Sequence, residues 1–249
     1  MIDWHRLSYS TFMLLSLVVF VAARQYMPKP AGLTRLPWWK RALLTFAGFF
    51  GGSVGGKLPF AFSSTAGMLS WQAWLSDGKT ITMALIGAYV GVEIAKWFLG
   101  ITVKTGDGFA IPLALALAVG RLGCFCNGCC YGVETSLPWG VVFHDGVPRH
   151  PMQIYESLFH LGMAAVLWGL MRGGLFRYQL LKLYLICYGV YRFFTEMIRP
   201  EPRDWWGLTF YQMVSVLLIA GLSVQWMFDE PRKRQEARVI TDTLACSPV

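Results

Sequence analysis

The sequence predicts an all-α, polytopic membrane protein with about seven transmembrane helices, and composition and patterning both support that fold class. The 249 residues are 55% hydrophobic and only 14% charged, with a mean hydropathy of +0.46. Soluble domains carry about a quarter charged residues. Apolar runs recur along the whole chain, with 11 Trp and 17 Phe among them. The net charge of +8 is therefore assigned to cytoplasmic loops, and no nucleic-acid binding is expected.

Seven apolar segments can be distinguished, since roughly 17–25 residues are needed to span a bilayer. The first ends in Ala-Ala-Arg and follows only a weak basic region, so it is predicted to be a retained helix and not a cleaved signal peptide. The second, FAGFFGGSVGGKL, has enough glycine to pack very closely against another helix or a lipid. The segments lie at about 7–23, 41–61, 80–100, 109–124, 152–171, 178–197 and 208–228.

The distribution of lysine and arginine predicts the orientation. If the loop after the first segment is cytoplasmic, most of the basic residues fall on that side of the membrane. The amino end is then outside and the carboxyl end is cytoplasmic. We expect one transmembrane helical domain over 1–228 and a basic cytoplasmic tail over 229–249.

A polar stripe runs along the sixth segment. Tyr184, Tyr188, Arg192 and Glu196 recur every four residues, with Arg199 three positions further on. Residues at this spacing share one face of a helix. Arginine inside a membrane segment is expensive and usually functional, although a structural ion pair with Glu196 is the alternative.

Two further polar elements are predicted to meet this stripe near the outer interface. The fifth segment carries Gln153, Glu156 and His160 at helical spacing, with Tyr155 beside them, and the fourth ends at Arg121. A guanidinium group offers planar, bidentate donors that suit a phosphate. The abundant phosphate at that depth is a phospholipid head group, so a lipid site is predicted.

The stretches GRLGCFCNGCCYG, HPMQIYES and YGVYRFFTEMIRP, in this order in a seven-span chain, resemble the phosphatidylglycerol–prolipoprotein diacylglyceryl transferases. The resemblance covers nearly the whole chain, and GGSVGGKL looks like the glycine-rich second segment of that family. It implies a bacterial plasma-membrane enzyme whose site opens to the outer leaflet. It also implies transfer of the diacylglyceryl group of phosphatidylglycerol to the lipobox cysteine of a prolipoprotein signal peptide. Glycerol phosphate leaves, and neither a cofactor nor a metal is expected.

The resemblance also implies roles for individual residues. Arg121 matches the arginine assigned to the lipid phosphate, and Arg192, Tyr188 and Glu196 match catalytic positions on the sixth helix. Tyr9 is similar to a first-helix tyrosine of the family. The remaining signature positions, expected to bind substrate, are Asn127, Gly128, Gly132, His150, Gln153, Tyr155 and Glu156.

The chain departs from the family pattern in two places. The His-Gly-Gly of the third helix is here Thr82, Met83 and Ala84, and two signature positions hold Cys124 and Cys129 in place of an asparagine and an acid. A divergent transferase, or a paralogue with another acceptor, is therefore expected. Glu196, Glu156 and His150 are candidate bases in place of the family histidine.

The four cysteines of C-x-C-x-x-C-C leave several alternatives open. Disulfides suit the oxidising outer side of a bacterial membrane. Inert packing, or a reactive thiol at Cys124 or Cys129, is also compatible with the spacing. A metal site is disfavoured, because four ligands within seven residues would crowd one another. Two function classes other than a transferase remain, a non-enzymatic phospholipid-binding protein and a thiol-handling membrane protein.

Overall fold

The computed structural model describes residues 4–28, 31–34, 36–63, 74, 80–203 and 206–245. These residues are mostly helical, as the sequence predicts, and each predicted apolar segment falls on a helix. The long helices are α1 (Trp4–Tyr26), α3 (Trp38–Ser63), α5 (Ile81–Phe98), α6 (Asp107–Cys126), α7 (Met152–Arg172), α8 (Leu180–Thr195) and α9 (Phe210–Ala245). The short elements are α2 (Ala31–Thr34), a 3₁₀ turn η1 (Glu196–Ile198), β1 (Val141–Val142) and β2 (Pro148–Arg149).

Five helices in the described part of the chain are long and apolar enough to cross a membrane. Helices α3 and α8 are not among them. Helix α8 has only 16 residues, and α3 contains Lys40, Arg41 and Lys57. The five candidate spans are Ser8–Tyr26, Ile81–Phe98, Asp107–Cys126, Met152–Arg172 and Phe210–Asp229.

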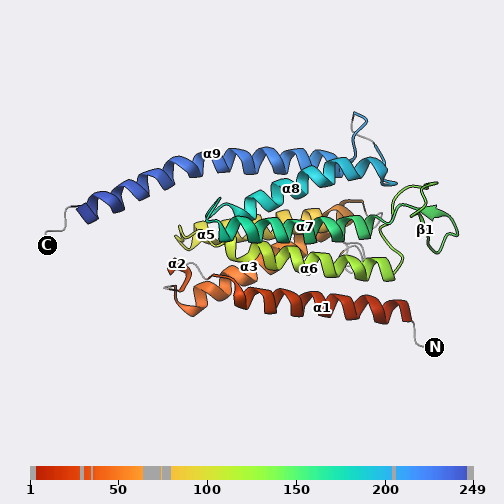
Figure 1. Ribbon diagram of the computed structural model, residues 1–249, viewed down its shortest axis with the longest axis horizontal. Coiled ribbons are helices and arrows are strands. Elements are labelled where there is room, and N and C mark those ends of the chain that lie inside the picture. Colours follow the sequence, from red (N-terminus) through yellow and green to blue (C-terminus); the bar gives the residue numbers. More distant parts are fainter. Residues whose placement is uncertain are drawn as a thin grey trace.

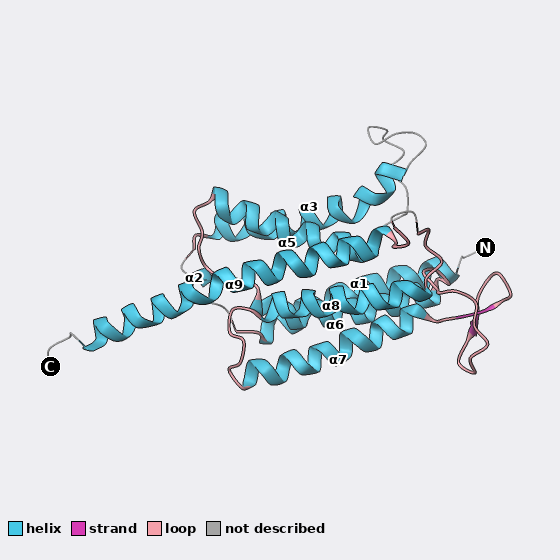
Figure 2. Cartoon of the chain, turned by 90° about the horizontal axis from the view of Figure 1, so that it is seen from above, coloured by secondary structure: helices cyan, strands magenta, loops and turns pink. Residues whose placement is uncertain are grey.

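The helices lie lengthwise in one bundle. The amino terminus and the β1–β2 hairpin lie at one end, and the last part of α9 projects beyond the other (Figure 1). Helix α3 packs on α5, α1 on α6, α6 on α7, and α8 on α9. Seen from above, the α3–α5 pair lies at one edge of the bundle and α7 at the opposite edge (Figure 2).

Glycines allow α3 and α5 to touch along their backbones. A Cβ added at Gly51 would lie 2.3 Å from the carbonyl oxygen of Gly87, and one at Gly55 would lie 2.4 Å from that of Met83. On the other helix, a Cβ at Gly91 would lie 2.5 Å from the Ala47 carbonyl oxygen. The prediction that the glycine-rich second segment packs very closely is confirmed, and its partner is a helix.

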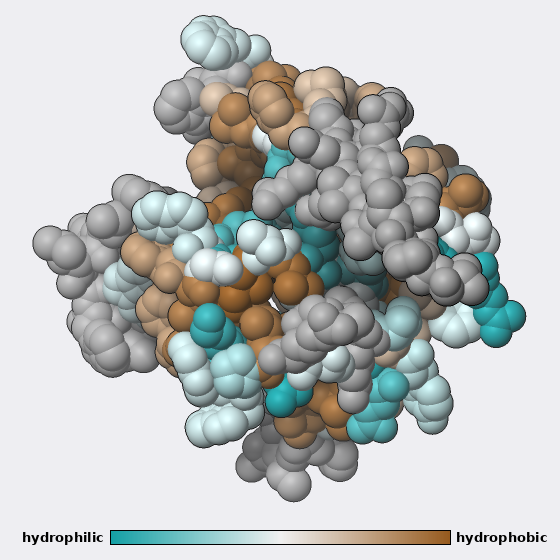
Figure 3. Space-filling view, turned by 90° about the vertical axis from the view of Figure 1, so that its left-hand side faces the viewer, coloured by the Kyte–Doolittle hydropathy of each residue, from teal (hydrophilic) through white to brown (hydrophobic). Residues whose placement is uncertain are grey.

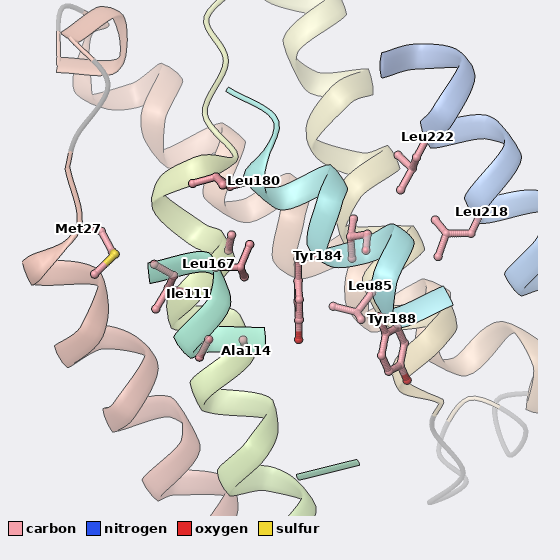
Figure 4. Close-up of a cluster of buried hydrophobic side chains, with 13 residues drawn as sticks. Met27, Leu85, Ile111, Ala114, Leu167, Leu180, Tyr184, Tyr188, Leu218 and Leu222 are labelled. Atoms are coloured by element: carbon pink, nitrogen blue, oxygen red, sulfur yellow. The ribbon is translucent and has the colours of Figure 1, made fainter. Parts of the chain in front are cut away.

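The apolar core lies between α5, α6, α7, α8 and α9. Tyr184 and Tyr188 are its largest fully buried side chains, and both extend in the same direction from α8 (Figure 4). Burying aromatic rings of this size stabilises the bundle, and each hydroxyl then needs a polar partner. The core therefore presents two phenol groups to the polar residues of neighbouring helices. Its members include Met27, Leu85, Ile111, Ala114, Leu167, Leu180, Leu218 and Leu222.

An ionic cluster connects three segments near the end where α9 projects. Asp229 of α9 pairs with Lys104, at 2.5 Å, and with Lys182 of α8. The carboxylate bridges α8 to α9 and to the loop before α6. Figure 3 views this end, where hydrophilic surface lies beside hydrophobic helix ends.

The β1–β2 hairpin was not predicted from the sequence. Val141 pairs with Arg149, and Arg149 also forms an isolated bridge with Glu134. The Arg149 guanidinium donates a hydrogen bond to Asp145 and lowers the pKa of that carboxyl from its usual value. Strands of two residues leave no alternating pattern long enough to detect. The hairpin belongs to the segment between α6 and α7.

Candidate functional site

The three polar elements predicted to converge do meet at one end of the bundle. Arg121 comes from the last turns of α6, Glu156 from the start of α7, and Arg192 from the end of α8. Glu196 and Arg199 follow on and just after η1. All five side chains are buried.

Glu156 is the centre of this cluster. Its Oε2 atom lies 2.6 Å from Nη2 of Arg121 and 3.1 Å from Nη2 of Arg199. Its Oε1 atom accepts a hydrogen bond of 2.9 Å from the Tyr188 hydroxyl. A fully buried carboxylate is tolerable only with such partners. Glu156 thus fixes two guanidinium groups and one phenol from three elements.

A second carboxylate holds the other side of the cluster. Glu196 Oε2 lies 3.0 Å from Nη2 of Arg192 and 3.9 Å from Nε of Arg199. The Arg192 guanidinium also lies over the Tyr211 ring, 5.1 Å from its centroid. The five buried charged groups therefore comprise three cations and two anions, and a third carboxylate, the half-buried Glu201, lines the pocket beside them.

The three arginines line a pocket of about 210 Å³. The Nε atoms of Arg121, Arg192 and Arg199 are buried and make no hydrogen bond within the described part of the chain. Such donors suit the oxygen atoms of an anionic ligand. The pocket is lined by Phe60, Thr80, Ile81, Thr82, Arg121, Cys130, Tyr131, Arg192, Arg199, Pro200, Glu201 and Tyr211.

The loop after α6 is held against the site by close packing at two glycines. Asn127 caps α6, and Gly128 follows with φ +63°, a conformation that favours glycine. A Cβ at Gly128 would lie 2.5 Å from Nε2 of His144. At Gly132 it would lie 2.6 Å from the carbonyl oxygen of Ile198. Both glycines therefore pack against protein atoms and position the loop.

His150, Gln153 and Tyr155 lie beside the pocket and are not among the residues that line it. The His150 Nδ1 atom is 3.2 Å from the Tyr155 hydroxyl, which also accepts a 2.8 Å hydrogen bond from Nε1 of Trp139. Gln153 donates a hydrogen bond of 2.5 Å to the carbonyl oxygen of Cys129. These contacts connect the start of α7 to the segment between α6 and α7.

Comparison with known proteins identifies the family. The model of the prolipoprotein diacylglyceryl transferase family matches residues 2–228. The chain belongs to this family.

Several relatives named phosphatidylglycerol–prolipoprotein diacylglyceryl transferase align with this family member. The Solidesulfovibrio magneticus protein is 37% identical over 160 residues, which cover 56% of this chain and 59% of that protein. A Coxiella burnetii protein is 33% identical over 208 residues, covering 74% and 77%. The Cupriavidus necator protein is 29% identical over 246 residues, covering 91% and 89%. With its apolar helices, this family member is a multi-pass membrane protein.

The departure from the family pattern at Thr82 falls inside the pocket. Thr82 is 1% exposed, lines the pocket, and its Oγ1 atom lies 3.4 Å from the Tyr188 hydroxyl. The side chain at this position therefore faces the arginine cluster. No histidine lines the pocket among the described residues of this family member.

Five cysteines lie in the described part of the chain, and three of them form a cluster beside the site. Cys124, Cys126, Cys129, Cys130 and Cys187 form no disulfide within the described part of the chain. The sulfur atoms of Cys124, Cys129 and Cys130 lie within 4.8 Å of one another. Cys187 is half-buried on α8, where packing was predicted. Cys246 lies outside the described residues.

Several pocket residues were not among the predicted site residues. Arg199 was recognised in the sequence at the end of the polar stripe, three positions after Glu196, but it was not assigned a role. Thr80 and Tyr211 had no such signal, because they reach the pocket from the ends of α5 and α9. Which helix ends meet is a property of the packed bundle.

Proposed function

We propose that this protein transfers the diacylglyceryl group of phosphatidylglycerol to the lipobox cysteine thiol of a prolipoprotein. The family to which the chain belongs supports this activity. The observation that carries it is the buried cluster of Arg121, Arg192 and Arg199 on one pocket. The buried Nε donors of these arginines, which make no hydrogen bond within the described part of the chain, suit the oxygen atoms of a phosphodiester.

Phosphate binding is assigned to Arg121 and Arg192, with Arg199 as a third donor. Guanidinium groups held by Glu156 and Glu196 are preorganised, so they need not rearrange when the ligand arrives. As the bond between the glyceryl carbon and the phosphate oxygen breaks, these cations stabilise the phosphate that leaves. Tyr188 lies between Glu156 and Thr82 and orients the cluster.

The acceptor thiol must become a thiolate before it can attack. Both oxygens of Glu156 are occupied by Arg121, Arg199 and Tyr188, which makes this carboxylate a poor base. Glu196 remains a candidate, and the remaining signature residues position the pocket walls. They are Asn127, Gly128, Gly132, His150, Gln153 and Tyr155.

The proposed site faces the outer leaflet of a bacterial plasma membrane. In this proposal α3 and α8 cross the bilayer together with the five candidate spans, the amino end is outside, and residues 229–249 are cytoplasmic. The distribution of lysine and arginine in the loops supports this orientation. Phosphatidylglycerol would then enter the site from the bilayer. The prolipoprotein would reach the site through its signal peptide.

A transfer assay tests the proposal. Purified protein is given phosphatidylglycerol labelled in its glycerol head group and a lipobox peptide. We expect release of glycerol phosphate with lipidated peptide, reduced roughly 10²-fold or more in Arg121→Gln, since one preorganised donor contributes about that much. Arg172→Gln is the matched control, because Arg172 lies at the opposite end of α7 from Glu156, roughly 20 Å or more away along the helix.

Two results would contradict the proposal. Lipid binding without release by the wild-type protein would indicate a non-enzymatic phospholipid-binding protein. Equal losses in Arg121→Gln and Arg172→Gln would show that the effect is not specific to the pocket.

A further inference from the structure

Three thiols gather beside the pocket, and one of them, that of Cys130, lines it. Cys124 lies in the last turn of α6, and Cys129 and Cys130 follow its end. The three sulfur atoms lie within 4.8 Å of one another, and those of Cys129 and Cys130 are 3.7 Å apart. Cys126 is not part of this group.

The backbone of the loop produces this arrangement. Gly128 and Cys130 both have positive φ, +63° and +65°, so the chain turns back toward the end of α6. The amide of Cys129 donates a 3.2 Å hydrogen bond to the carbonyl oxygen of Cys124. Positive φ is uncommon for a residue other than glycine, and such conformations cluster at functional sites.

The spacing of the sulfurs suits a tetrahedral metal ion. A zinc–sulfur bond is about 2.3 Å long, which places two sulfurs of a tetrahedral site about 3.8 Å apart. The Cys129–Cys130 separation already has this value, and the other pairs need to close by about 1 Å at most. Four ligands within seven residues would crowd one another, but the fold brings together only three.

The cluster adjoins the proposed reaction site. Cys130 lines the pocket together with Arg121, Arg192 and Arg199. The Arg121 guanidinium is within electrostatic range of the Cys124 and Cys130 sulfurs and would offset the negative charge of thiolates there. The Tyr9 hydroxyl of α1 is also close enough to interact electrostatically with the sulfur atoms of all three cysteines.

We propose that Cys124, Cys129 and Cys130 hold a zinc ion whose fourth position binds the acceptor cysteine thiol. Three protein ligands and one open position are the usual pattern of a catalytic zinc site. A thiol that coordinates such an ion is deprotonated outright. The inference rests on the proposed function. It supplies an activating group at the pocket, whose described lining contains Glu201 as the only carboxylate and no histidine.

The step balances without an oxidant or reductant. The acceptor thiol binds zinc and releases its proton to solvent. Its sulfur then attacks the glyceryl carbon that carries the phosphate. A carbon–sulfur bond forms, the carbon–oxygen bond to the phosphate breaks, and glycerol phosphate leaves with the electron pair. Zinc remains on the three protein cysteines.

Metal binding is tested first, independently of activity. The full chain is purified in detergent with a mild reductant, and its zinc content is measured. In a second sample Co²⁺ replaces zinc, so that the site can be observed by its absorbance. We expect one ion per chain and a sulfur-to-cobalt charge-transfer band. Both are lost in Cys124→Ser and Cys130→Ser and kept in Cys126→Ser, the matched control from the same loop. Absence of metal uptake, or a Cys124–Cys129 disulfide in protein purified without reductant, would overturn the inference.

Thiol activation is tested second. A cysteine lipobox peptide, but not its serine analogue, should strengthen the charge-transfer band. Removing zinc with a chelator should lower lipid transfer more than tenfold, and added zinc should restore it. Transfer that is unaffected by chelation, with loss of activity in Glu201→Gln, would overturn the inference and leave the proposed function intact. No transfer with or without zinc would instead contradict the proposed function itself.

Discussion

Glu156 determines the electrostatics of the site at the level of single residues. One buried carboxylate compensates Arg121 and Arg199 and accepts the Tyr188 hydrogen bond. Removing one partner of such a group costs about 3–5 kcal/mol, because the remaining charges stay buried. In the proposed function, the lipid phosphate and Glu156 would act on the same cations.

We predict that Glu156→Gln lowers the unfolding temperature in detergent by roughly ten degrees. Phosphatidylglycerol should restore part of the loss, since its phosphate supplies a negative charge beside the unpaired guanidinium groups. Phosphatidylcholine, which has no net charge, should restore less. Thermal unfolding with each lipid measures this, and Glu134→Gln, at an exposed carboxylate, is the control. Equal effects of the two lipids would disprove the electrostatic explanation.

The sequence predicted much of the site, because its charged residues lie at helical spacing. The stripe of Tyr184, Tyr188, Arg192 and Glu196 was visible from periodicity alone, and Arg121 and Glu156 stood out as ionisable groups in apolar segments. The clustering of the three thiols could not be predicted. It depends on two positive φ angles after α6, which spacing does not encode.

The limits of the helices were also predictable, whereas their pairing was not. Apolar length places both ends of each long helix to within a few residues, except for the carboxyl end of α9. The glycines of α3 indicated close packing but did not identify α5 as the partner, because several helices offer small residues. The extension of α9 to Ala245 was not predicted, because the residues directly after 228 are mostly charged and include Pro231, through which the helix continues.

The α3–α5 contact leads to a prediction for a whole element. In Gly87→Ala the new Cβ would lie 2.2 Å from the carbonyl oxygen of Gly51, so the two helices must separate. Overpacking of this kind costs about 1–3 kcal/mol. Because α5 also carries Thr82 into the pocket, transfer activity should fall together with stability.

Gly162→Ala on α7 is the matched control for this contact. Nothing lies within 4 Å of a Cβ at that position, and alanine favours a helix over glycine by about 1 kcal/mol. Thermal unfolding and the transfer assay are measured on both variants. If the two alanines had the same effect, the close contact between α3 and α5 would not be what stabilises that pair.

For the whole molecule, the orientation in the membrane can be tested with fusions. The seven spans proposed above would place the two ends of the chain on opposite sides, and the excess of lysine and arginine predicts that the carboxyl end is inside. Alkaline phosphatase, which needs an oxidising compartment for its disulfides, should be inactive when fused after residue 249 or within 173–178. It should be active when inserted at 145–146, in the hairpin loop beside the pocket. Green fluorescent protein, exported unfolded, should show the opposite pattern. Phosphatase activity at the carboxyl end would place the thiols and the arginine pocket on the cytoplasmic side, where the outer-leaflet site proposed here could not operate.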